Sequence, residues 1–129
     1  MIVYHGSSEI VTHPDIVHSY RPFDFGRGFY VTTNKEQAIR WARGKSKLKK
    51  SEKSYVNVYD LSSDESEYEV KVFADDLMEW IDFVCNCRDG GTEYTAFDII
   101  KAYPGYDQIA FVSQKAIDGM LTFLSVEEV

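Results

Sequence analysis

The spacing of apolar residues along the chain predicts a mixture of strands and helices. Short runs that alternate in polarity or are rich in aromatic and β-branched residues favour strands. We expect such strands at Ile2–Tyr4, Phe29–Thr32, Tyr55–Leu61, Tyr68–Phe73, Phe97–Ile100, Gln108–Val112 and Met120–Leu124. Regular alternation of strand, helix and strand is missing, so we predict an α+β fold and not a doubly wound sheet.

The first predicted helix begins near Asn34. Thr33 followed by Glu36 fits a capping box, in which the two side chains satisfy backbone N–H groups at the helix start. Its expected inward-facing residues are Ala38, Ile39, Trp41 and Ala42. We expect the basic stretch from Arg43 to Lys53 to be a fraying helix end and a loop, because cations suit a helix C-terminus.

A second amphipathic helix is predicted between Ala74 and Val84. Its apolar residues follow the i, i+3, i+4, i+7 spacing of a helix with one buried face. They are Leu77, Trp80, Ile81 and Val84. Ser113–Asp118 is expected to be a short helix or a turn, so the chain would hold two main helices.

A glycine-containing stretch at Asp24–Thr33 is the most informative part of the chain. Gly26 and Gly28 allow the backbone to turn sharply or to approach a ligand where a Cβ would clash. The strand predicted next would hold Tyr30 beside this turn, where an aromatic ring can face a flat ligand.

Length and charge limit the class of protein. A chain of 129 residues with 44% hydrophobic residues is expected to form a single domain, 1–129. The net charge of −7 argues against general binding to nucleic acid or membranes. The chain has no apolar run of about 18 residues and opens directly into a predicted strand, so we expect a cytoplasmic protein.

Neither a disulfide nor a metal site is expected. Cys85 and Cys87 are separated by one residue, not by the two that are usual in metal-binding or redox pairs, and are interpreted as reduced thiols. His13 and His18 have no carboxylate or cysteine partners at metal-ligand spacing.

Five segments, in order, resemble the ADP-ribosyltransferase superfamily in its His-Tyr-Glu branch, and more closely a small bacterial toxin-like domain family linked to toxin–antitoxin systems. The segments are VYHGS at Val3–Ser7, DFGRGFYVTTNKEQAIRWA at Asp24–Ala42, VNVYDL at Val56–Leu61, EWIDFV at Glu79–Val84 and DQIAFVSQKAIDGMLTF at Asp107–Phe123. The resemblance implies split, strongly curved antiparallel sheets with two main helices and an NAD-binding cleft between the sheets.

The resemblance also implies roles for individual residues. His5 would hydrogen-bond a ribose hydroxyl of NAD, and the backbone of Gly6 would hold the nicotinamide amide with help from the Ser7 hydroxyl. Tyr30 would stack on the nicotinamide ring, since a tyrosine face suits a flat cation. Gln108 falls at the third position, which is a glutamate in many transferases.

Arg27, in the glycine loop, would face the expected cleft and contact NAD, or would be a solvated arginine. Structural interpretations also exist for the other residues: His5 as a strand-end histidine, Tyr30 as a core aromatic and Gln108 as a polar residue of an edge strand. The lysine-rich run Lys45–Lys53 is interpreted as solvated surface or, alternatively, as a docking patch for an acidic partner or an RNA acceptor.

The expected function is therefore an NAD-dependent mono-ADP-ribosyltransferase, with NAD as substrate and a protein or nucleic acid as acceptor. The resemblance implies the toxin of a toxin–antitoxin pair, with an antitoxin protein as a partner. An amide at Gln108 carries no charge, and neutral hydrogen bonds contribute about 0.5–1.5 kcal/mol against about 1.5–3 kcal/mol for charged ones. A non-catalytic module that binds NAD, ADP-ribose or a protein, or an NAD glycohydrolase, are the alternatives.

Overall fold

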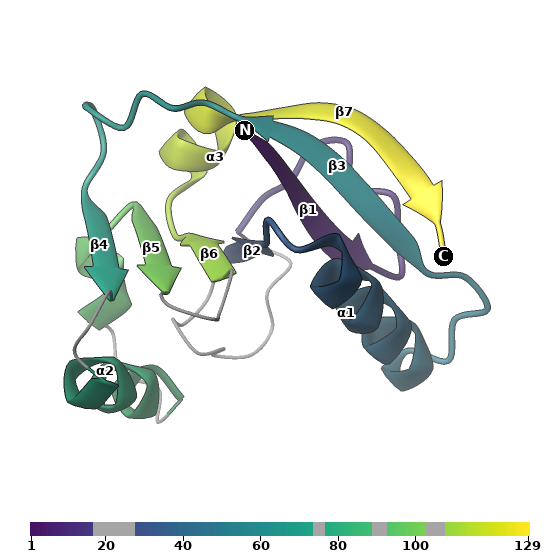
Figure 1. The fold of residues 1–129 in the computed structure, drawn as a ribbon, viewed down its shortest axis with the longest axis horizontal. Coiled ribbons are helices and arrows are strands. Elements are labelled where there is room, and N and C mark those ends of the chain that lie inside the picture. Colours follow the sequence, from purple (N-terminus) through teal and green to yellow (C-terminus); the bar gives the residue numbers. More distant parts are fainter. Residues whose placement is uncertain (17–27, 74–76, 89–92, 103–107) are drawn as a thin grey trace. The chain divides into compact units, whose positions relative to one another are not determined.

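The computed structural model describes residues 1–16, 28–73, 77–88, 93–102 and 108–129 (Figure 1). Within these ranges the fold is α+β, as predicted, with three α-helices and two open sheets. The chain divides into two compact units. Unit 1 contains Met1–Pro14, Val31–Ser63 and Met120–Val129, and unit 2 contains Asp15–Tyr30 and Asp64–Gly119.

Unit 1 is built on a three-stranded antiparallel sheet. Its strands, in spatial order, are β1 (Ile2–Ser7), β3 (Tyr55–Leu61) and β7 (Leu121–Glu128), which lie side by side in Figure 1. His5 on β1 stands opposite Asn57 on β3. The prediction that the first strand ends at Tyr4 was wrong, because pairing with β3 continues to Ser7 and overrides the low strand propensity of the His-Gly-Ser segment.

Helix α1 (Lys35–Leu48) packs against β1 and β3. Its N-cap is Asn34, whose side chain accepts a hydrogen bond from the backbone N–H of Gln37 at 3.3 Å. The capping box expected at Thr33 was therefore placed one residue too early. The buried residues of α1 are Ala38, Ala42 and Ser46.

The basic stretch after Ala42 is mostly helix. We expected a fraying end and a loop from Arg43, but α1 runs to Leu48. The Ser46 hydroxyl donates to the carbonyl oxygen of Lys53 at 2.7 Å, so this buried side chain fastens the following loop to the helix. Part of the basic stretch therefore belongs to the packed structure of unit 1.

Unit 2 contains most of a four-stranded mixed sheet. Its strands, in spatial order, are β2 (Phe29–Val31), β6 (Gln108–Phe111), β5 (Ile99–Ala102) and β4 (Val70–Phe73), and the last residue of β2 belongs to unit 1. Strands β5 and β6 are antiparallel, but β4 and β5 are parallel, so the prediction of purely antiparallel sheets was wrong. Helix α2 (Leu77–Arg88) and the 3₁₀ turn η1 (Glu93–Ala96) supply the long connection that a parallel pair requires.

The core of unit 2 is a cluster of buried apolar side chains. Its members are Phe73, Phe83, Val84, Ile100, Ala110 and Val112. The Phe73 and Phe83 rings lie 5.0 Å apart, and Phe83 is 6.3 Å from Phe97, measured between ring centroids. Tyr30 and Phe97 are partly buried against this cluster.

Helix α3 (Gln114–Met120) adds a third α-helix to the two main helices that were expected. It lies where a short helix or a turn was predicted. The Ser113 hydroxyl accepts from the backbone N–H of Ala116 at 3.2 Å and caps the helix start. In the ranges given above, none of the helices combines the length and apolar character needed to cross a bilayer.

Candidate functional site

His5 is buried within unit 1, with 8% of its surface exposed. Asn57 faces it from β3 and is completely buried. The Asn57 side chain donates to the carbonyl oxygens of His5 and Glu9 at 3.4 and 3.2 Å and accepts from the N–H of Val11 at 2.8 Å. One amide side chain thus ties the segment after β1 to the sheet beside His5.

Tyr59, two residues further along β3, holds the same segment. Its hydroxyl donates to the carbonyl oxygen of Val11 at 2.6 Å, and burial raises the pKa of this phenol well above its ordinary value. Sequence reasoning missed Asn57 and Tyr59. The available signal was a polar residue, Asn57, between valines in the strand Val56–Val58.

The backbone of Gly6 points away from β3. The N–H and C=O groups of Tyr4 both bond to Thr32, at 2.8 and 2.9 Å, and groups two residues apart on a strand point to the same side. The N–H and C=O groups of Gly6 therefore lie outside the β1–β3 ladder. An N–H and a C=O on one side of a strand can bond a carboxamide when both are free.

The Gly6 carbonyl already has a partner within unit 1. Lys45 on α1 donates from its Nζ to this oxygen at 2.8 Å. Burial, together with the charge of Lys49, lowers the pKa of Lys45 to about 8. Lys45 was predicted as part of a solvated or docking run. The signal that was missed is its spacing of three residues from Ala42 and seven from Ala38, which places Lys45 on the buried face of a helix that continues past Arg43.

Gly6 also has a packing role. A Cβ at this position would lie 2.0 Å from the carbonyl oxygen of Ala38 and 2.7 Å from the nitrogen of Ala42. Helix α1 can approach β1 this closely only because residue 6 has no side chain. The adjacent Ser7 is buried, and its hydroxyl accepts from the N–H of Glu9 at 3.2 Å, so it stabilises the turn that follows β1.

Tyr30 and Gln108 lie in unit 2 on neighbouring strands, β2 and β6. Both side chains are partly exposed. A Cβ at Gly28 would lie 2.6 Å from the carbonyl oxygen of Phe111, so this glycine permits the close approach of the two strands. Gln108 begins β6 and pairs with Ala102 of β5. Arg27 lies outside the described residues.

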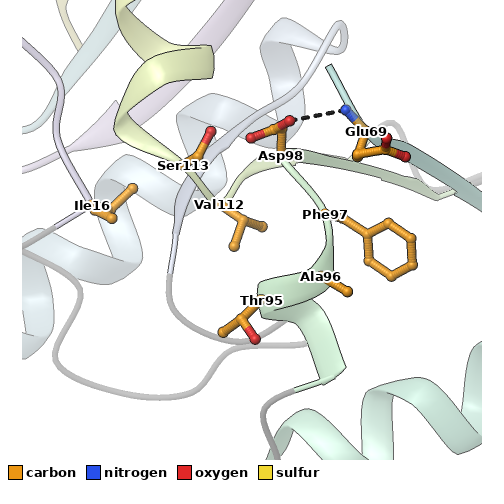
Figure 2. Close-up of a pocket in the computed structure, with 8 residues that line it drawn as sticks. All are labelled: Ile16, Glu69, Thr95, Ala96, Phe97, Asp98, Val112 and Ser113. Atoms are coloured by element: carbon orange, nitrogen blue, oxygen red, sulfur yellow. Dashed lines mark hydrogen bonds between the residues drawn. The ribbon is translucent and has the colours of Figure 1, made fainter. Parts of the chain in front are cut away.

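A separate open hollow of about 440 Å³ lies in unit 2 (Figure 2). Its lining residues are Ile16, Glu69, Thr95, Ala96, Phe97, Asp98, Val112 and Ser113. The Asp98 carboxylate accepts from the N–H of Glu69 at 2.9 Å and lies between Glu69 and Ser113 (Figure 2). Burial raises the pKa of Asp98, but the hydrogen bonds from Ser113 and Glu69 and the charge of Lys115 together lower it below its ordinary value.

These bonds give Asp98 a structural role. Its own N–H donates to the carbonyl oxygen of Glu69, and its carbonyl accepts from Val112, both at 2.8 Å. Asp98 thus joins the segments that precede β4 and α3. Across the described part of the chain, no group of three or more His, Cys, Asp or Glu side chains is arranged to hold a metal ion.

Comparison with known proteins identifies one family. The sequence profile of the family described as "Protein of unknown function (DUF3990)" matches residues 1–123, which is nearly the whole chain. No curated protein and no solved structure matches the chain.

Proposed function

The chain belongs to the DUF3990 family, whose function is unknown, and we propose that it is an NAD-dependent ADP-ribosyltransferase. His5 hydrogen-bonds a ribose hydroxyl of NAD, and the Gly6 backbone binds the nicotinamide amide. Tyr30 stacks on the nicotinamide ring, and Gln108 orients the ribose 2′-hydroxyl. The acceptor is a macromolecule.

The observation that carries this proposal is the pair Tyr30 and Gln108. Both are partly exposed and lie on strands that are neighbours in one sheet of unit 2. Tyr30 is partly buried and packs against the apolar cluster of that unit. An aromatic face held in this way and a nearby amide are the groups that a flat cationic ring and a sugar hydroxyl require.

The departure of nicotinamide requires no proton transfer, because the pyridinium is already a cationic leaving group. The bond between ribose C1′ and the nicotinamide nitrogen breaks, and its electron pair neutralises the pyridinium as nicotinamide leaves. A lone pair of the acceptor forms the new bond to C1′, and the acceptor loses a proton to the solvent. The site has to stabilise an oxocarbenium-like transition state, so a carboxylate in place of Gln108 would help more than the amide.

Nicotinamide release and label transfer test the proposal. The purified protein is incubated with NAD labelled in the adenylate half and a cell lysate, and free nicotinamide and labelled macromolecules are measured. Tyr30→Ala removes the stacking face, whereas Tyr30→Phe keeps it, so only the first variant should lose activity. Gln108→Glu should raise the rate about tenfold or more, and Gln108→Ala should not.

Absence of both products from the wild-type protein and from Gln108→Glu would overturn the proposal. Thermal melting of each variant separates loss of chemistry from loss of fold, because Tyr30 also packs on the core of unit 2. Labelled macromolecules indicate transfer, whereas free ADP-ribose without label transfer indicates a glycohydrolase. Growth arrest on expression that His5→Ala abolishes would support the role of a toxin.

A non-catalytic NAD-binding module is the second candidate. Two observations favour it: residue 108 is an amide, and the Gly6 carbonyl already accepts from Lys45. Calorimetry with NAD distinguishes the two functions. Saturable binding with no nicotinamide produced, by either the wild-type protein or Gln108→Glu, would assign the module.

A further inference from the structure

The outer face of α1 carries cations that the fold of unit 1 does not use. Arg40, Arg43 and Lys47 are spaced by three and four residues, so they lie on one side of the helix, and all three are exposed. This side is opposite the one that packs on β1 and β3. We refer to Arg40, Arg43, Gly44, Lys47 and Leu48, with the partly buried Trp41 at their edge, as the outer face of α1.

Charge is divided very unevenly along the chain. Residues 40–53 contain seven of the fourteen Lys and Arg residues and one of the twenty-one Asp and Glu residues. This segment therefore carries +6 and the remaining residues −13, which sum to the net charge of −7. A local cationic surface on a strongly acidic protein selects anionic partners by electrostatic complementarity.

The same face also exposes apolar surface. Leu48, the last residue of α1, lies between Lys47 and Lys49, and its apolar side chain is 78% exposed. Trp41, two turns earlier on the same side, is only partly buried. Trp41, Gly44 and Leu48 follow the i, i+3, i+7 spacing, so they form one apolar row beside the cations.

Gly44 has no packing reason to be a glycine. A Cβ at this position would meet no atom within 4 Å, so Ala would fit. Glycine inside a helix costs about 1 kcal/mol relative to Ala. What Gly44 provides is bare helix backbone between Trp41 and Leu48, against which a second element can pack closely.

We propose that the outer face of α1 docks an acidic amphipathic helix of a partner protein. Apolar side chains of that helix pack on Trp41, Gly44 and Leu48, and its carboxylates bind Arg40, Arg43 and Lys47. A phosphodiester backbone would use the cations but would gain nothing from Leu48, and the −13 charge of the remaining chain would repel it. This inference does not depend on NAD chemistry.

Binding of defined probes to the full chain tests the proposal. The first probe is a synthetic helical peptide of about 18 residues with glutamates on one side and leucines at i, i+3, i+4 and i+7 on the other. The second is the same peptide with its leucines replaced by serines, and the third is a single-stranded oligouridylate of about 12 nucleotides. Fluorescence anisotropy at two salt concentrations gives the dissociation constants.

The leucine peptide should bind at least about tenfold more tightly than the serine peptide and than the oligouridylate. Lys47→Gln should weaken peptide binding by about threefold or more and lower its salt dependence. Lys35→Gln, the same change at the other end of α1, is the matched control and should leave binding within about twofold. Leu48→Ser and Gly44→Gln should weaken binding without changing its salt dependence.

Three results would overturn the proposal. Tighter binding of oligouridylate than of the leucine peptide would make the face a nucleic-acid surface. Equal effects of Lys35→Gln and Lys47→Gln would mean that only net charge matters. Unchanged affinity in Leu48→Ser would show that the apolar row is not part of an interface. All of the substituted positions are exposed, so the variants should keep their fold. Circular dichroism of each variant checks that its helix content is unchanged.

Discussion

Lys45 donates a 2.8 Å hydrogen bond from its Nζ to the carbonyl oxygen of Gly6. Gly6 thus contributes to the packing of α1 on β1 in two ways. Its carbonyl accepts this hydrogen bond, and its lack of a side chain lets α1 approach β1 closely. The ammonium group of Lys45 is held away from water in an environment that disfavours its charge. The stability of the protein should therefore depend on the protonation of one lysine.

Replacing Lys45 by methionine should change how stability varies with pH. Burial lowers the pKa of Lys45 from 10.5 to about 8, so between these values the unfolded chain binds more protons than the folded one. The free energy of unfolding contributed by this group therefore rises as pH increases through that window. Wild type should gain about 2 kcal/mol relative to Lys45→Met between about pH 7 and about pH 10.

Urea denaturation of wild type and Lys45→Met at each pH gives the difference in their free energies of unfolding. The other titrating groups are the same in both proteins, so their contributions cancel in this difference. Lys47→Met is the control, because Lys47 is exposed on the same helix and its charge is not among those that shift the pKa of Lys45. A constant difference between wild type and Lys45→Met across the window would contradict the lowered pKa.

Gly6→Ala should strongly destabilise unit 1. The new Cβ would clash with the backbone of α1 at Ala38 and Ala42, which can move only if the whole helix shifts. We expect a loss of about 3 kcal/mol, at the upper end for overpacking. Gly44→Ala, on α1 itself, is the control and should instead stabilise by up to about 1 kcal/mol, since its Cβ meets open space. Thermal unfolding that shifts equally in both variants would refute the close packing of α1 on β1.

Two glycines of unit 2 should respond differently to the same change. A Cβ at Gly28 would meet the backbone oxygen of Phe111 at 2.6 Å, whereas one at Gly119 would meet the hydroxyl of Tyr68 at 2.0 Å. The end of a side chain can move aside more easily than a strand. Gly28→Ala should therefore cost about 2–3 kcal/mol and Gly119→Ala less than half of that, measured by chemical denaturation. The reverse order would mean that Tyr68 is held more rigidly than β6.

Asn57→Ala should loosen the segment that follows β1. Three backbone groups, of His5, Glu9 and Val11, lose their partner at once, and unsatisfied buried groups cost about 1–3 kcal/mol each. We expect a total loss of about 3 kcal/mol. Hydrogen exchange at the Val11 amide should become much faster in the variant. Unchanged exchange there would show that Tyr59 alone holds the segment.

Most elements could be predicted from apolar spacing, because period and propensity act locally. The strand Tyr55–Leu61 was located to the residue, and the β2 segment was found with an error of one residue at its end. The start of α1 was found with a similar error, but the helix continues to Leu48 through residues expected to fray. The end of β1 was missed because His5, Gly6 and Ser7 are strand residues only through pairing with β3. The residues of β4 and β5 give no indication that the two strands pair in parallel.

The candidate residues divide in the same way. A glycine before a predicted strand and a histidine before Gly-Ser were visible as motifs, and the DUF3990 match covers both. Lys45 could be placed on the buried face only by continuing the helix past Arg43, and its partner, the Gly6 carbonyl, follows only from the packing of α1 on β1. Asn57 is visible in the sequence as a polar residue within an apolar strand, but its hydrogen-bond partners could not be predicted from the sequence.

The amino-acid order by itself determined the α+β class and the approximate extent of the strands and helices, because these depend on local spacing and on runs of residue types. The tertiary structure alone decided which polar groups are buried and with whom they bond. Asn57, Tyr59 and Lys45 acquire their roles from partners about 40 or more residues away along the chain. Such pairings follow from the close packing of a strand and a helix, which no local pattern encodes.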